Sequence, residues 1–111
     1  MHQEKRGLRF EFKADAEVFP EGSFKSSRGR AKQLSLRGCF VEAAGAFTEH
    51  QRVRVKISHE LESLECCAEV IYVLSDGVGL LFTDMTADVR DILQKWVLAA
   101  LSRQSEEVPT R

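Results

Sequence analysis

Apolar and charged residues alternate through the first part of the chain, and this period of two constrains the fold more than any other feature. The apolar members are Leu8, Phe10, Phe12, Ala14, Ala16 and Val18, and the charged members are Arg9, Glu11, Lys13, Asp15 and Glu17. Successive side chains of an extended strand point to opposite faces, so the pattern predicts a half-buried strand over residues 8–18. Pro20, Glu21 and Gly22 predict the turn that ends it.

Several later segments have the composition of short strands. They are residues 24–34, 39–41, 52–57, 64–73 and 78–82. The third of these alternates like the first strand, with Val53, Val55 and Ile57 predicted to point inward. Asp76 and Gly77 predict a tight turn between the last two segments. Short strands with short connections indicate an antiparallel sheet that closes, or nearly closes, on itself.

The period of the pattern changes near the C-terminus, where apolar residues recur at helical spacing. These residues are Val89, Ile92, Leu93, Trp96, Val97, Ala100 and Leu101. The spacing predicts a helix over residues 86–102 whose apolar stripe packs over an opening or a face of the barrel. Either Asp84 or Thr86 is expected to cap its N-terminus. Residues 104–111 are polar, contain Pro109 and are expected to form a flexible tail.

Length and charge limit the classes of function. The chain has 111 residues, which is enough for one domain with a modest core. It contains no apolar run of about 18 residues that would span a bilayer, and residues 1–10 do not resemble a secretory signal. We therefore expect a cytoplasmic protein that does not insert into membranes. The formal net charge is -1, so attraction for an anion must come from local basic clusters, at residues 5–9 and 25–37.

The sequence gives little support for metal binding or catalysis. The three cysteines are Cys39, Cys66 and Cys67, with no C-x-x-C pair, so neither a disulfide framework nor a zinc site is expected. Because Cys66 and Cys67 are adjacent in a predicted strand, one is expected in the core and the other exposed. The histidines lack partners at metal-ligand spacing. No nucleophile–base pair is present, so we expect neither a metal cofactor nor an enzymatic activity.

The stretch from residue 32 to residue 42 carries the most specific pattern. Gln33, Ser35 and Gly38 occupy the frame Q-x-S-x-x-G directly before a short apolar strand. This frame resembles the signature of the PilZ domain family, in which Asp or Asn stands at the first position.

Two further features strengthen the resemblance. The second motif of the PilZ family consists of two arginines four residues apart, upstream of the first motif. Lys5 and Arg9 match that frame here, and Arg6 is an alternative match for its first position. The strand expected within residues 77–84 and the amphipathic helix after it resemble the end of a PilZ domain. The resemblance covers roughly residues 5–101.

The resemblance implies a fold and a division of the chain. The expected fold is mainly β, a six-stranded antiparallel PilZ-like β-barrel with one C-terminal α-helix. A single domain would occupy residues 1–103, with an N-terminal ligand-binding arm at about residues 1–10, and the flexible tail would follow.

The resemblance also implies a ligand, the bacterial second messenger cyclic di-GMP. Its site residues would be Lys5, Arg6, Arg9, Gln33, Ser35 and Gly38. An arginine fork can bond a phosphate bidentately or reach the O6 and N7 acceptors of guanine. The first residue of the Ser-containing motif would accept hydrogen bonds from guanine N–H groups, the serine would offer its hydroxyl, and the glycine would permit a close backbone approach.

The sequence departs from the family pattern at two of these positions. Lys5 replaces the first arginine and loses the planar fork, and Gln33 replaces Asp or Asn by a neutral and longer acceptor. Hydrogen bonds to a charged acceptor are stronger than neutral ones, so the two changes together are expected to weaken binding by ~1–3 kcal/mol. We therefore expect a cyclic di-GMP receptor of reduced affinity that signals by closure of its N-terminal arm.

Two other classes of function remain open. In the first, the domain is a degenerate PilZ-like adaptor that binds no nucleotide and contacts an unknown protein of a motility, pilus or secretion system. In the second, it is a nucleic-acid-binding barrel, but Arg52, Arg54 and Lys56 alternate outward without aromatic residues between them, which is typical of a solvated face. We therefore expect no nucleic-acid partner. The Ser35–Gly38 segment is also expected to form a hairpin turn, whether or not it binds a ligand.

Overall fold

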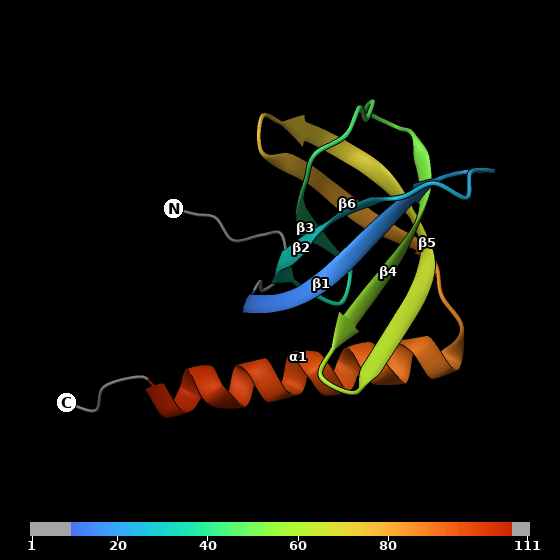
Figure 1. The fold of residues 1–111 in the computed structure, drawn as a ribbon. Helices are drawn as coiled ribbons and strands as arrows, with labels where there is room; N and C mark the ends of the chain where they lie inside the picture. Colours follow the sequence, from blue (N-terminus) through green and yellow to red (C-terminus); the bar gives the residue numbers. More distant parts are fainter. Residues whose placement is uncertain (1–9, 108–111) are drawn as a thin grey trace.

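The structure, a computed structural model, describes residues 10–107. Its elements are β1 (Phe10–Pro20), β2 (Ser27–Leu34), β3 (Gly38–Ala43), β4 (Arg52–His59), β5 (Glu62–Leu74), β6 (Gly77–Asp84) and α1 (Ala87–Glu107). The strands form a closed barrel in the order β1-β2-β3-β6-β5-β4, and every neighbouring pair is antiparallel. In Figure 1, α1 lies across the lower end of this barrel. The predicted six-stranded antiparallel β-barrel with one C-terminal α-helix is confirmed.

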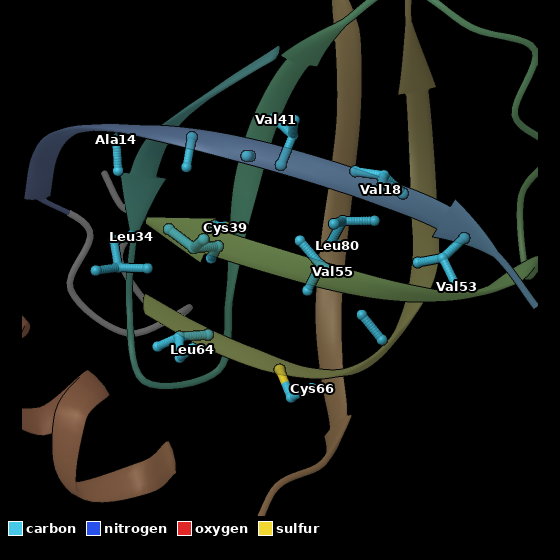
Figure 2. Close-up of a cluster of buried hydrophobic side chains, with 14 of the residues drawn as sticks. Ala14, Val18, Leu34, Cys39, Val41, Val53, Val55, Leu64, Cys66 and Leu80 are labelled. Carbon is cyan, nitrogen blue, oxygen red and sulfur yellow. The ribbon is translucent and has the colours of Figure 1, made fainter. Parts of the chain in front are cut away.

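Ala14 and Val18 of the alternating pattern lie in the interior of the barrel together with Val53 and Val55 of β4, as Figure 2 shows. Ala14 and Ala16 of β1 are buried, and Val18 lies opposite the equally buried Val55 of β4. Each large aliphatic side chain that is fully buried stabilises the fold by ~1.5–3 kcal/mol. The prediction that β1 and β4 are half-buried strands is therefore confirmed for the described side chains, whereas Leu8 lies outside the described residues.

The second strand begins at Ser27 and not at residue 24, where the sequence predicted it to begin. Pairing with β1 ends where Val18 lies opposite Ser27. Just before this point, the hydroxyl oxygen of Ser23 accepts a 3.0 Å hydrogen bond from the amide of Lys25, which turns the backbone away from the sheet. Phe24 lies in this connection and is 95% exposed.

The sequence predicted the N-terminus of α1 better than its C-terminus. At the N-terminus, Thr86 Oγ1 accepts a 3.3 Å hydrogen bond from the amide of Val89, so Thr86 is the cap of the two candidates. At the C-terminus the helix continues to Glu107, beyond the predicted end at residue 102. Residues 104–107, which were expected in the polar tail, are helical because no helix-breaking residue precedes Pro109.

The apolar stripe of α1 packs against the barrel for only part of its length. Leu93, Trp96 and Ala100 are buried, which confirms the prediction that the stripe belongs to the core. Leu98 and Leu101 are exposed, and Figure 1 shows the C-terminal part of α1 extending past the strands. Within the described chain, no helix combines the length and the apolar character needed to cross a membrane.

Candidate ligand-binding site

The Ser35–Gly38 segment forms the turn between β2 and β3, and the serine side chain holds this turn together. Ser35 Oγ accepts hydrogen bonds from the amides of Arg37, at 3.1 Å, and of Gly38, at 3.2 Å. The amide of Ser35 donates to the carbonyl oxygen of Gly38 at 2.9 Å, which closes the turn. The predicted structural role of this segment as a hairpin turn is confirmed.

Position 38 requires a glycine because β6 passes very close to it. Gly38 lies opposite Leu81 of β6, and a Cβ atom built at Gly38 would stand 2.0 Å from the carbonyl oxygen of Leu80. A backbone oxygen cannot retreat from such a contact without moving the strand. The glycine of the motif therefore permits the close approach of β3 and β6.

Gln33 lies on the outer face of β2 and begins a row of residues that crosses four strands. It is exposed and lies opposite Phe40 of β3, which lies opposite Gly79 of β6, which in turn lies opposite Tyr72 of β5. The rings of Phe40 and Tyr72 are stacked, with centroids 6.3 Å apart and planes inclined by 19°. The row therefore connects the first position of the motif to an aromatic pair on the barrel wall.

A pocket of about 300 Å³ opens beside the motif turn. It is lined by Ser35, Arg37, Gly38, Cys39, Ile71, Tyr72, Gly79, Leu80 and Leu81. Ser35 and Gly38 are brought together here, whereas Gln33 is not among the lining residues. A pocket of this size lies at the lower limit of ordinary small-molecule sites.

The predicted residues Lys5, Arg6 and Arg9 lie outside the described residues. The first described residue, Phe10, lies opposite Leu34, the residue that immediately precedes the motif serine. Phe10 of β1 therefore lies next to the Ser35–Gly38 turn, at the same end of β2.

Arg37 and Tyr72 of the pocket were not among the predicted site residues. Arg37 is exposed, and among the described residues no carboxylate lies within ion-pairing distance of it. Tyr72 reaches the site only through the pairing of β5 with β6 and of β6 with β3. No local sequence motif marks Tyr72, so only knowledge of the strand order would have identified it.

Several of the other basic side chains on the barrel are paired with acidic neighbours. Arg28 Nε lies 3.3 Å from Glu17, and Lys32 Nζ lies 3.1 Å from Glu42. Arg54 pairs with Glu65 and also covers the ring of Phe19, 4.4 Å from its centroid. Of these, Arg54 was predicted to lie on a solvated face, and its side chain is 41% exposed.

The cysteines lie as the strand pattern predicted. Cys66 is buried and Cys67 is exposed, so the two adjacent thiols point to opposite faces of β5. Burial raises the pKa of the Cys66 thiol to about 12, which keeps it protonated. Within residues 10–107, no three His, Cys, Asp or Glu side chains gather into a group that would hold a metal ion.

The sequence and the fold are both similar to those of known PilZ domains. The sequence model of the PilZ domain matches residues 2–99. The fold is similar to the PilZ domain of YcgR from Escherichia coli with c-di-GMP, with a TM-score of 0.74 and 14% identity over 96% of this chain and 100% of that chain. It is also similar to the PilZ domain of CeSA from a cellulose-synthesizing bacterium, with a TM-score of 0.68 and 14% identity over 88% of this chain and 99% of that one.

A third similar structure is the Bacillus subtilis inhibitor of motility MotI/DgrA, with a TM-score of 0.76 and 18% identity. The comparison covers 97% of this chain but only 55% of MotI/DgrA, so the chain spans about half of that protein. At these identities the structural likeness shows a common fold. Comparison with curated proteins gave no match.

Proposed function

The chain belongs to the PilZ domain family, and on this premise we propose that it is a cyclic di-GMP receptor of reduced affinity. PilZ domains form a family of cyclic di-GMP receptors, and the similar YcgR domain has been solved with this ligand. The observation that carries the proposal is the pocket of about 300 Å³ beside the motif turn, at the end of the barrel where Phe10 of β1 lies opposite Leu34.

The charges and hydrogen-bonding groups near the turn support an anionic ligand. Arg37 lines the pocket, and none of the acidic groups among the described residues neutralises it through an ion pair. Arg9 directly precedes Phe10 in the sequence, and Phe10 lies opposite Leu34, the residue before the motif serine. We therefore propose that Arg9 contacts a ligand at the turn. Arginine bonds phosphates bidentately in a way that lysine does not.

Each site residue has a proposed role. Arg9, with Lys5 or Arg6, would contact phosphates or the acceptor edge of guanine, and Gln33 would accept hydrogen bonds from guanine N–H groups. Ser35 and Gly38 would hold the turn in the shape that the ligand contacts. The Ser35 hydroxyl oxygen already accepts hydrogen bonds from two backbone amides, and Gly38 lies directly against the backbone of β6. The reduced affinity follows from Lys5 and Gln33, which replace a planar fork and a charged acceptor.

We propose closure of the N-terminal arm as the signal. An arm at about residues 1–10 that folds over the ligand would change the position of the start of β1. β1 also contacts α1, so this strand is a physical connection between the ligand site and the helix at the barrel end. In this proposal the domain occupies residues 1–103, works in the cytoplasm and carries out no catalysis.

A second candidate function is that of an adaptor that binds a protein without a nucleotide. The observation that favours it is the exposed apolar surface on the free part of α1, where Leu98 is 63% exposed and Leu101 is 40% exposed. A protein of a motility, pilus or secretion system would be the expected partner. A substitution of Arg9 distinguishes the two functions, because only the receptor requires this residue.

Calorimetric titration with cyclic di-GMP tests the proposal. Arg9→Ala should weaken binding by ~2 kcal/mol, because it removes a charge-assisted contact to phosphate or guanine. The matched control is Arg52→Ala, since Arg52 is an exposed arginine at the start of β4 and outside the pocket at the turn. Equal losses in the two variants would indicate unspecific charge attraction and would count against the receptor.

A further inference from the structure

The ring of Tyr72 occupies a position that only a glycine neighbour allows. Gly79 lies opposite Tyr72, and a Cβ atom built at Gly79 would stand 2.3 Å from Cε2 of the tyrosine ring. The ring therefore lies over Gly79 of β6. Its stacking on Phe40 supports it on the side of β3. Tyr72 is half-buried and lines the pocket, so part of its surface is left for another molecule.

A register shift brings a second side chain from the same strand to this pocket. Val70 lies opposite Leu80 and Tyr72 opposite Gly79, so Ile71 has no residue opposite it. Consecutive side chains of a regular strand face opposite sides, but the irregularity lets both Ile71 and Tyr72 line the pocket. Such shifts are common next to functional sites, where they redirect a side chain.

The chemistry of the pocket is divided between its two sides. On the β5 and β6 side it presents the tyrosine ring together with Ile71 and Leu81, which are 39% and 37% exposed. On the turn side it presents Arg37 and the polar backbone of the Ser35–Gly38 turn. An aromatic and apolar wall, together with a guanidinium that has no ion-pair partner among residues 10–107, fits a molecule that carries a flat aromatic group and an anionic group.

We propose that Tyr72 is the base-stacking platform of the site, on which a purine base of the bound nucleotide lies while its phosphate faces Arg37. This inference rests on the proposed function and adds a contact from outside the two motifs. Every nucleobase has a flat π-face, and a base stacked on an aromatic side chain gains a contact that does not depend on its hydrogen-bonding edge. The platform thus offsets part of the affinity lost at Lys5 and Gln33.

A purely structural role of the ring, as a cover for Gly79, predicts different behaviour. A leucine at position 72 would still cover the glycine but would offer no aromatic face, whereas a phenylalanine would offer both. We expect Tyr72→Phe to bind cyclic di-GMP about as tightly as the wild type. We expect Tyr72→Leu to bind more weakly, by about 5- to 150-fold, the range measured when aromatic platforms are removed. The matched control is Val73→Ala, an exposed neighbour on β5 that does not line the pocket.

The test combines calorimetry with the nuclear magnetic resonance signals of the ring. Tyr72 is the only tyrosine of the chain, so its ring protons give one set of signals, which a stacked base shifts upfield. The proposal predicts this upfield shift on addition of cyclic di-GMP to the wild type, and a loss of affinity in Tyr72→Leu but not in Tyr72→Phe or Val73→Ala. Thermal unfolding of each variant shows that it is folded.

The outcomes separate the platform from the receptor function. If the wild type binds cyclic di-GMP, but the ring signals stay in place and Tyr72→Leu binds equally well, the platform is wrong and the receptor stands. If the wild type binds no cyclic di-GMP at all, both proposals are overturned.

Discussion

The indole Nε1 of Trp96 donates a 3.1 Å hydrogen bond to Oε1 of Glu62, and this contact joins α1 to the hairpin between β4 and β5. The other carboxylate oxygen of Glu62 accepts a hydrogen bond from Nζ of the neighbouring Lys95 at 2.5 Å. The ring of His59 meets the Trp96 ring edge-on, with centroids 5.5 Å apart. One carboxylate thus holds two consecutive residues of the helix, so the helix is fixed by polar contacts as well as by burial.

The first prediction concerns the buried indole. Trp96→Ala should lower the free energy of unfolding by ~3–5 kcal/mol, because it removes a large buried side chain and leaves a cavity. Leu98→Ala is the control, since Leu98 lies on the same helix and is 63% exposed, and it should change stability by no more than about 0.5 kcal/mol. Urea denaturation measures both. A loss below about 1 kcal/mol for Trp96→Ala would mean that the helix does not dock through this face.

The second prediction concerns pH. Hydrogen bonds from Lys95 and then from Trp96 hold the pKa of Glu62 below its ordinary value of 4.5. The folded state therefore favours the charged carboxylate, so this contribution to stability is fully present above that ordinary value and is lost as the pH falls through the lower pKa of the folded state.

Thermal unfolding of the wild type and of Glu62→Gln between pH 7 and pH 3 checks this expectation. The wild type should exceed the variant in stability by a constant amount in the upper part of the range and by less at the acidic end. A difference that stays constant down to pH 3 would contradict the role of the Glu62 charge.

Much of the fold was predictable from the sequence because the patterns that specify it are local. The alternation around Ala14 and Val18 and the helical spacing around Trp96 each reflect which face of one element is buried. The start of β2 was not predictable in this way, because a serine-to-backbone turn at Ser23 removes Phe24 from the sheet although its composition fits a strand.

The candidate site was predictable only in part, for a related reason. The motif of Ser35 and Gly38 is contiguous in the chain, and its turn forms from local hydrogen bonds. Arg37 and Tyr72 meet at the pocket because β3, β6 and β5 are neighbours in the barrel, although the chain places β4 between β3 and β5. Residue spacing alone does not give this order of strands.

The third prediction concerns the N-terminal arm. If the arm closes on the ligand, the amides of residues 5–9 should exchange with solvent more slowly when cyclic di-GMP is bound, because ligand contacts order the segment. Hydrogen exchange with and without saturating ligand measures this. The amides of Val53 and Val55 in the barrel core serve as the internal control and should not change. Unchanged exchange at residues 5–9 under saturation would contradict signalling by arm closure.

The fourth prediction concerns the two departures from the family motifs. Gln33→Asp restores a charged acceptor for guanine N–H groups, and Lys5→Arg restores the planar fork. Each should strengthen cyclic di-GMP binding by ~0.5–1.5 kcal/mol, the scale of one better hydrogen bond. GTP should gain less, because it does not engage both motifs at once.

The affinity of the double variant Lys5→Arg/Gln33→Asp for cyclic di-GMP, titrated by calorimetry beside the wild type, tests the receptor function most directly. The account predicts measurable binding by the wild type and a gain in affinity of about 5- to 150-fold in the double variant. This range corresponds to the sum of the two single gains in binding free energy. Thermal unfolding establishes that the variant remains folded. A stable double variant that shows no detectable binding would contradict the receptor and favour the adaptor.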